Sequence, residues 1–264
     1  QNPISAVAMK NISGKKILSL QGNYSKQILL LHGQTAGSIS KKLEKNALKW
    51  ADEITVPSKE MYQEYVKNGY KVSYVPNAID ISSFSHDEDR RYQKQLIYAG
   101  RLSEEKGILD LLNFLKILSK DIHLMILGSG PEESKVKVMA KRFPNLHFLG
   151  YQSKENTIKL IRGSDMLIQP SLMEGGTSST ILEAMACKTP IIATSVDGNK
   201  DTIIHMKTGY VIASNNPPEI HDAVNYLFNN PEKLEIIINN AYDLVSNYDW
   251  EHVGQKYLDV YNSV

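Results

Sequence analysis

One stretch of the sequence combines glycines with carboxylates in a way that suits a phosphate and a sugar. Glu174-Gly175-Gly176-Thr177-Ser178 lies between an apolar segment at 166–171 and another at 181–187, which contains Glu183. Glycines let the backbone approach a ligand closely, and the unpaired N–H groups at the start of a helix attract anions. We therefore interpret the stretch as a phosphate-and-sugar site. A helix capped by Ser178 or by the adjacent serine is the alternative interpretation.

A second stretch contains two cations at a similar place. The segment 95–99 predicts a strand, Gly100 and Arg101 follow as its turn, and Lys106 precedes the start of a helix. A fork-shaped guanidinium together with an ammonium suits a diphosphate. The alternative is a pair of surface cations that interact with Glu104 and Glu105.

A histidine also lies at the predicted end of a strand. The apolar run 27–31 predicts a short strand, and His32 opens the turn that follows it. Parallel sheets bind ligands at the carboxyl ends of their strands, so a functional His32 is as well supported as a structural one.

The elements that would position these residues alternate along the chain. Helices fill most of the gaps between short apolar strands, which is typical of a parallel sheet covered on both faces. A helix over 38–51 would direct Ile39, Leu43, Ala47 and Trp50 to a core, and its four lysines mostly to the other side. The predicted strands are 53–57, 72–75, 95–99, 122–127, 146–148, 165–169, 190–194 and 210–213, and the last helices are 217–229, 231–247 and 250–262.

A charge run at 86–91 is the best candidate for a linker between two domains. We place the boundary near residue 85, which gives a first domain of residues 1–84 and a second of residues 85–264. The first 84 residues carry a net charge of +5 and the remainder −4. Such a basic region could contact an anionic membrane surface or an anionic acceptor, or it could simply be a solvated helix face.

The composition excludes several classes of protein. Cys187 is the single cysteine, so the sequence has no internal disulfide or multi-cysteine metal site, and we expect a reducing, cytoplasmic compartment. The sequence shows no apolar run long enough to cross a bilayer and no signal peptide. Because the chain begins with Gln1, we expect that further residues precede it. Basic residues are not interleaved with aromatics, so nucleic-acid binding is not expected.

Together these stretches resemble glycosyltransferase family 4. The resemblance rests on Gly100-Arg101, the Glu174 stretch with 182–186, the glycines at 128–130, the segment 76–80 and the His32-Gly33 turn. It covers nearly the whole chain and is strongest from residue 95 to residue 213. Members of this family have the GT-B fold, in which two Rossmann-like domains face each other across a cleft. Here the first domain looks short by several strands.

The resemblance implies a retaining transfer of a hexose from a nucleoside-diphosphate sugar to a glycan, lipid or small-molecule acceptor. It implies that Arg101 and Lys106 neutralise the departing diphosphate, and that Glu174 and His32 contact the donor sugar. No metal and no cofactor are then required, because two side-chain cations take the place of a metal. The other implied donor contacts are the turn N–H groups for the phosphates, Glu183 for the ribose and Tyr151 for the base, with Gly100, Gly175, Gly176, Thr177 and Ser178 forming the backbone of the site.

One departure from the family pattern concerns Glu174. The family usually places seven residues between its two glutamates, whereas eight lie between Glu174 and Glu183. Either the additional glycine bulges and Glu174 keeps its role, or the role is lost, and we favour the bulge.

Three other functions were considered. No convincing cofactor-lysine motif supports a pyridoxal-phosphate glycan phosphorylase, and no strand leads into the glycine motif of a dinucleotide oxidoreductase. An inactive sugar-nucleotide-binding or interaction protein is the strongest alternative, because the first domain is short and Glu174 is displaced. Turnover with an acceptor would distinguish an enzyme from a binder.

Overall fold

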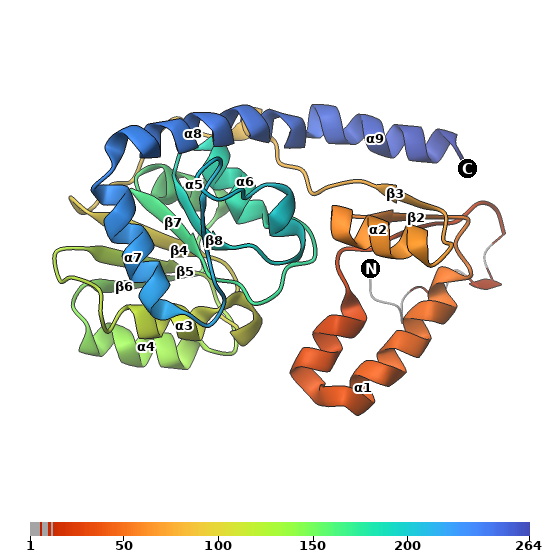
Figure 1. Ribbon diagram of the computed structural model, residues 1–264, viewed down its shortest axis with the longest axis horizontal. Coiled ribbons are helices and arrows are strands. Elements are labelled where there is room, and N and C mark those ends of the chain that lie inside the picture. Colours follow the sequence, from red (N-terminus) through yellow and green to blue (C-terminus); the bar gives the residue numbers. More distant parts are fainter. Residues whose placement is uncertain (1–5, 7–9, 12) are drawn as a thin grey trace.

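The computed structural model describes residue 6, residues 10–11 and residues 13–264, without the side chains of residues 30–32. It contains two parallel sheets that lie side by side (Figure 1). We call β1–β3 with α1 and α2 the N-terminal unit, and β4–β9 with α3–α8 the C-terminal unit. The strands are β1 (Ile17–Ser19), β2 (Glu53–Val56), β3 (Val72–Tyr74), β4 (Gln95–Ala99), β5 (His123–Leu127), β6 (Leu146–Gly150), β7 (Met166–Gln169), β8 (Ile191–Thr194) and β9 (Tyr210–Ile212).

The helices connect successive strands and then extend the chain beyond the last strand. Short 3₁₀ turns lie between them, of which Glu104–Lys106 and Asp197–Asp201 bear on the site. The helices are α1 (Tyr24–Leu48), α2 (Lys59–Lys67), α3 (Ile108–Phe114), α4 (Glu133–Arg142), α5 (Lys154–Arg162), α6 (Ser179–Ala186), α7 (Pro217–Phe228), α8 (Pro231–Val245) and α9 (Trp250–Asn262).

The six-stranded sheet of the C-terminal unit is covered on both faces. Its strand order is β6-β5-β4-β7-β8-β9, and all the pairs are parallel. Alternate residues of β4 point in opposite directions: Leu96 and Tyr98 pack with α3, α4 and α7, and Ile97 and Ala99 with α5, α6 and α8. This explains why its strands are continuous apolar runs, and the six strands predicted after residue 95 are all present.

The N-terminal unit is smaller. Its sheet has the order β1-β2-β3, and its core is formed mainly by one face of that sheet with the ends of α1 and α2. The prediction of a strand at 27–31 was wrong, because this run lies within α1. Asn23 caps the helix by accepting a hydrogen bond from the Lys26 N–H at 3.0 Å, and a short apolar run suits a helix as well as a strand. Gly33, at φ 79°, only kinks α1 and does not end it.

The buried face of α1 also differs from the prediction. Ile39 and Leu43 are exposed, whereas Ser40 and Glu44 are buried. Glu44 is held there because the Tyr65 hydroxyl donates to it at 2.5 Å and the Ser25 N–H donates to it at 3.2 Å. A buried carboxylate is tolerated when it accepts hydrogen bonds, so this polar pairing sets the rotation of the helix.

The chain crosses between the two units twice, and the two crossings are hydrogen-bonded to each other. The Ile79 N–H donates to the Tyr248 carbonyl at 3.0 Å, and the Trp250 N–H donates to the Ile79 carbonyl at 3.0 Å. After the second crossing α9 runs alongside the N-terminal unit (Figure 1), where Val253 and Val260 are buried with Val75. None of the helices in the described part of the chain combines the length and apolarity needed to cross a membrane.

Candidate active site

The predicted site residues converge on the centre of the six-stranded sheet. The strands β4 and β7 are neighbours there, although β5 and β6 separate them in the sequence. Chain connections leave the sheet in opposite directions from this point, which opens a crevice at the carboxyl ends of the strands. Gly100 and Arg101 follow β4, and the turn that contains Glu174 follows β7. The fold therefore brings together two stretches that lie far apart in the sequence.

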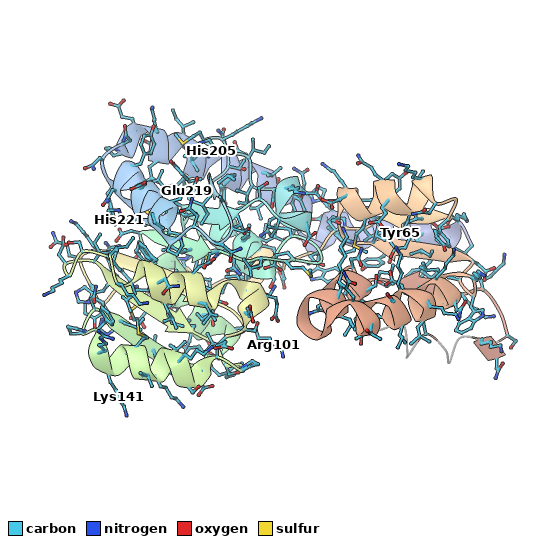
Figure 2. The ribbon with its side chains drawn as sticks, turned by 60° about the horizontal axis from the view of Figure 1, so that its bottom comes forward. Tyr65, Arg101, Lys141, His205, Glu219 and His221 are labelled. Carbon is cyan, nitrogen blue, oxygen red and sulfur yellow. The ribbon has the colours of Figure 1, made fainter. Side chains whose placement is uncertain are left out.

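Two clefts meet at Arg101. The first, of about 430 Å³, lies between the units and is lined by Arg101, Lys106 and Glu174 from one side and by residues 21–24, Lys26 and Gln27 from the other. The second, of about 470 Å³, follows the carboxyl ends of β4, β5 and β6. Figure 2 shows Arg101 on the side of the C-terminal unit that faces α1. An elongated ligand could occupy both clefts while touching the Arg101 guanidinium.

Lys106 and Glu174, which both line the first cleft, form a partly buried ion pair. The Lys106 Nζ lies 2.6 Å from the Glu174 Oε2, and the Ser171 hydroxyl donates to the Glu174 Oε1 at 2.8 Å. Only 7% of Glu174 is exposed. Gly107 places Lys106 here, because at φ 69° its backbone contacts Pro170 so closely that a Cβ would lie 1.9 Å from the Pro170 carbonyl oxygen.

Arg101 is available to bind an anion. Its side chain is 62% exposed, and its described ionic partner, the Glu105 Oε1, lies 4.0 Å away. The Tyr98 hydroxyl donates to the Arg101 carbonyl at 2.7 Å and so fixes the backbone of the turn. Burial, reinforced by the charges of Glu174 and Glu105, raises the pKa of Tyr98, so this hydroxyl remains a donor.

The glycines of the Glu174 turn pack against the N-terminal unit. A Cβ on Gly175 would lie 2.0 Å from the Gln21 carbonyl oxygen, and one on Gly176 would lie 2.7 Å from the Pro57 Cβ. The Asn77 side-chain amide donates to the Thr177 carbonyl at 2.8 Å in the same contact. The glycines are therefore required by the close approach of the two units, a reason that the sequence did not reveal.

The backbone N–H groups of this turn differ in their partners. The Ser178 N–H donates to the Asn199 Oδ1 at 3.2 Å, so this predicted phosphate donor already has an acceptor. Within the described part of the chain, the N–H groups of Gly176 and Thr177 have no acceptor. Ser178 occupies the N-cap position of α6 without a side-chain capping bond, so the capping alternative is not seen.

The remaining donor-site candidates lie in three different places. Glu183, on α6, is buried and pairs with the Lys154 Nζ, which lies above the Phe84 ring. Tyr151 lines the second cleft and is 80% exposed. His32 lies in α1 and not in a turn after a strand, and its side chain lies outside the described part of the structure.

Two groups of site residues were missed by the sequence analysis. Asp197 lines the first cleft and accepts a hydrogen bond from the Glu174 N–H at 2.9 Å. It follows β8, the neighbour of β7, so the strand-end rule could have identified it. The turn at residues 21–23 was also missed, because the three-residue strand β1 before it is too short for a clear pattern. Its signal was a glycine followed by the helix-capping Asn23.

The chain is similar in sequence to known glycosyltransferases. A family model for glycosyl transferases group 1 matches residues 79–244. An uncharacterized glycosyltransferase from Methanocaldococcus jannaschii is 24% identical over 94% of this chain and 66% of its own. The phosphatidyl-myo-inositol mannosyltransferase of Mycobacterium leprae is 25% identical over 72% of this chain and 53% of its own. The chain thus spans about half to two thirds of the length of these relatives.

The fold matches solved glycosyltransferase structures along nearly the whole chain. HepE from Anabaena, solved in complex with UDP-glucose, superposes with a TM-score of 0.82 at 17% identity, covering 99% of this chain and 76% of that one. The two parallel sheets therefore correspond to the GT-B architecture, with a shortened N-terminal part, as the resemblance had implied. Since the family model covers more than half of its residues, the chain belongs to the group 1 glycosyl transferases.

Proposed function

We propose that this protein is a retaining glycosyltransferase, which moves a hexose from a nucleoside-diphosphate sugar to a hydroxyl of a glycan, lipid or small molecule. The bond between the anomeric carbon and the diphosphate oxygen breaks, a bond to the acceptor oxygen forms, and the diphosphate leaves with the acceptor's proton. The observation that carries the proposal is the position of Arg101 after β4, where two clefts meet, together with Lys106 in the first of them. Residues 1–84 and 85–264 are proposed as its two domains.

Arg101 and Lys106 are assigned to the diphosphate. Negative charge grows on the leaving diphosphate as the glycosidic bond breaks, so cations that are already in place stabilise the transition state more than the ground state. The Lys106 ammonium is held by Glu174 and needs little reorganisation, and the exposed Arg101 guanidinium can engage two phosphate oxygens at once. These two cations are the reason for proposing a reaction without a metal ion or another cofactor.

The other donor contacts follow from the positions of the side chains. The N–H groups of Gly176 and Thr177 are proposed to hold the phosphates, with Gly100 and Gly175 allowing their close approach. Tyr151, which lines the second cleft, is assigned to the base, and Glu183, which pairs with Lys154 on α5, is assigned to the ribose hydroxyls. Glu174 is proposed to face the donor sugar. The assignment of His32 to that sugar rests on the family resemblance alone.

The exposed apolar residues of α1 support a further contact with a membrane. Ile39 and Leu43 are exposed next to Lys41, Lys42 and Lys45, a combination that favours anionic lipid surfaces. We propose a cytoplasmic protein that can bind the inner face of a membrane through α1. Co-sedimentation with vesicles, with and without anionic lipid, tests this contact. The wild type should sediment with anionic vesicles and not with neutral ones. A variant in which the three lysines are replaced by glutamine should sediment equally with both.

An inactive sugar-nucleotide-binding protein remains the alternative. The observation that favours it is the hydrogen bond from the Ser178 N–H to Asn199, which occupies one predicted phosphate donor. Release of the nucleoside diphosphate from a nucleotide sugar, measured with and without added sugar or lipid acceptors, separates the two functions. A binder would show thermal stabilisation without release.

The proposed function is tested first by thermal melts with UDP, GDP and ADP. A ligand that binds the folded state at about a hundred times its dissociation constant adds about 2.7 kcal/mol. One of these nucleotides should raise the melting temperature of the wild type. Arg101→Ala should melt at the same temperature as the wild type without nucleotide, but the nucleotide should not raise its melting temperature. Arg142→Ala, at the end of α4 and outside both clefts, is the matched control and should keep it. An unchanged shift in Arg101→Ala would refute the diphosphate assignment.

A further inference from the structure

Three consecutive residues after β8 accept hydrogen bonds from the Glu174 turn. The Asp197 Oδ2 accepts from the Glu174 N–H at 2.9 Å, and the Gly198 carbonyl accepts from the Thr177 hydroxyl at 2.7 Å. The Asn199 Oδ1 completes the set by accepting from the Ser178 N–H. The turn is therefore supported along its whole length by one neighbouring segment.

Asp197 adopts an unusual backbone conformation in order to do this. Its φ is 39°, in the left-handed region where residues other than glycine are uncommon, although aspartate is tolerated there better than most. Gly198, beside it, packs so tightly that a Cβ would lie 2.2 Å from the Gly176 carbonyl carbon. A non-glycine residue held in this conformation beside a cleft often serves a function.

Asp197 also presents an unused acceptor to the first cleft. The cleft is lined by three acidic residues, Glu105, Glu174 and Asp197, and by three basic ones, of which Arg101 and Lys106 are assigned to the diphosphate and Lys26 is not. Each oxygen of Glu174 has a donor, namely Lys106 for one and Ser171 for the other. For Asp197, a donor reaches only Oδ2, and among the described residues none donates to Oδ1. A carboxylate oxygen that faces a cleft without a donor is suited to accept a hydrogen bond from a ligand hydroxyl.

We propose that Asp197 is a specificity-determining residue for the donor sugar. Its Oδ2 positions the Glu174 turn, and its Oδ1 accepts a hydrogen bond from a hydroxyl of a neutral hexose. The same negative charge disfavours a donor whose sugar carries a carboxylate, such as a uronic acid. This inference rests on the proposed function, because it assigns the donor sugar to the first cleft.

Electrostatics predicts that the cleft favours a neutral donor sugar over one that carries a carboxylate. A second carboxylate within a few ångströms of Asp197, in a cleft partly shielded from water, experiences like-charge repulsion that neutral sugars avoid. The hydroxyl of a neutral hexose instead supplies the donor that Oδ1 lacks. We expect the wild type to use the neutral donor at least about tenfold better than its uronate counterpart, measured as the ratio of the two kcat/KM values.

Two variants separate the charge of Asp197 from its backbone role. Asp197→Asn tolerates the left-handed backbone and keeps an oxygen for the Glu174 N–H, but it removes the negative charge. Asp197→Gly removes the side chain and suits φ 39° without strain, so it should fold. Asn215→Gly is the matched control, since Asn215 also has a positive φ of 56° but lines neither cleft.

The experiment compares UDP-glucose with UDP-glucuronate, or GDP-mannose with GDP-mannuronate if GDP is the nucleotide that binds. It measures release of the nucleoside diphosphate by the full chain, alongside melts with the free nucleotide. In Asp197→Asn the preference for the neutral sugar should fall at least about tenfold, while binding of the free nucleotide stays unchanged. Asp197→Gly should lose the preference and also use the neutral donor less well, because the Glu174 turn loses a support. Asn215→Gly should match the wild type.

Three results would overturn the inference in distinguishable ways. If the preference of Asp197→Asn equals that of the wild type, or if the wild type shows none, Asp197 does not select the sugar and the diphosphate assignment is unaffected. If no nucleotide stabilises the wild type, the proposed function fails and this inference falls with it.

Discussion

The two units of this molecule reach stability in different ways. The C-terminal unit has six strands with apolar layers on both faces, which together bury most of its aliphatic residues. The N-terminal unit has three strands and one small core, and its longest helix buries Ser40 and Glu44 while Ile39 and Leu43 are exposed. Since a three-stranded sheet gains little from its own burial, the N-terminal unit depends on its contacts with α9 and with the Glu174 turn.

The two units also contribute different parts of the site. Arg101, Lys106 and Glu174 all belong to the larger unit, whose cores fix the strand ends that carry them. The smaller unit closes the first cleft with the turn at residues 21–23 and packs against Gly175. The substitutions below, given in order of decreasing effect, first disrupt the contact between the units and then test each unit separately.

The largest effect is expected from Gly175→Ala, which attacks the contact between the units. The new Cβ would lie 2.0 Å from the Gln21 carbonyl oxygen, so the units must move apart or the turn must shift. Because a displacement of about 1 Å at reacting groups can cost about a hundredfold in rate, nucleotide-sugar turnover should fall by at least that factor. Gly254→Ala on α9, where a Cβ meets nothing within 4 Å, is the control. Full turnover in Gly175→Ala would show that the two units work independently.

The same substitution in each core compares their stability directly. Ile168 in β7 is fully buried and Ile54 in β2 is 2% exposed, so truncation to alanine should cost each unit about 2–5 kcal/mol. Hydrogen exchange followed by mass spectrometry should show faster exchange in 95–212 for Ile168→Ala. For Ile54→Ala, hydrogen exchange should be faster in residues 17–75 and unchanged in β4–β9. Loss of protection everywhere in Ile54→Ala would mean that the two units unfold as one.

A smaller effect is expected from Tyr65→Phe. The Tyr65 hydroxyl donates to the buried Glu44 at 2.5 Å, and its removal leaves a carboxylate oxygen without that donor. Loss of one partner of a buried hydrogen bond costs about 1–3 kcal/mol, which chemical denaturation of the N-terminal unit would detect. Tyr62→Phe, at a tyrosine that is 39% exposed, is the matched control. Equal stabilities for the two variants would show that Glu44 does not set the rotation of α1.

The smallest effect concerns the chemistry of Cys187, which reports on the C-terminal unit alone. Burial raises the pKa of this thiol to about 11, so at pH 8 the folded protein holds it protonated and unreactive. Reaction with a disulfide reagent at pH 8 should be slow in the wild type and no faster in Ile54→Ala. In Ile168→Ala it should accelerate, because the destabilised C-terminal unit unfolds more often, although Ile168 packs on the face of the sheet opposite Cys187. Fast labelling of the wild type would contradict the burial of this cysteine.

Most of the fold of the C-terminal unit could be predicted because its strands are buried on both faces. Ile97 and Leu167 lie in uninterrupted apolar runs that a helix-period pattern does not explain. These segments could therefore be assigned as strands that alternate with helices along the chain. In the N-terminal unit the run at 27–31 was ambiguous, since its assignment depended on the cap at Asn23 and not on its own pattern. The inward rotation of Glu44 depended on a tertiary partner, Tyr65, that no local signal indicates.

The chemistry of the site was partly predictable for the same reason. Arg101 and Glu174 were found because each follows a well-marked strand, and the strand order then made them neighbours. The pairing of Lys106 with Glu174 and the support from Asp197 depend on side-chain distances that a sequence does not contain. The glycines at 175 and 176 were predicted to let the backbone approach a ligand, whereas in the structure they let it approach another part of the chain.

The position of α9 has a consequence for how the protein is made. Val75 is synthesised before the whole C-terminal unit, whereas its partners Val253 and Val260 follow that unit in the sequence. The C-terminal unit, whose strands and helices follow one another closely, can fold as it emerges, because domains generally fold as units during synthesis. The N-terminal unit must therefore wait with an uncovered apolar surface until α9 has been synthesised. During that interval nascent chains are exposed to aggregation and to chaperones through the N-terminal unit.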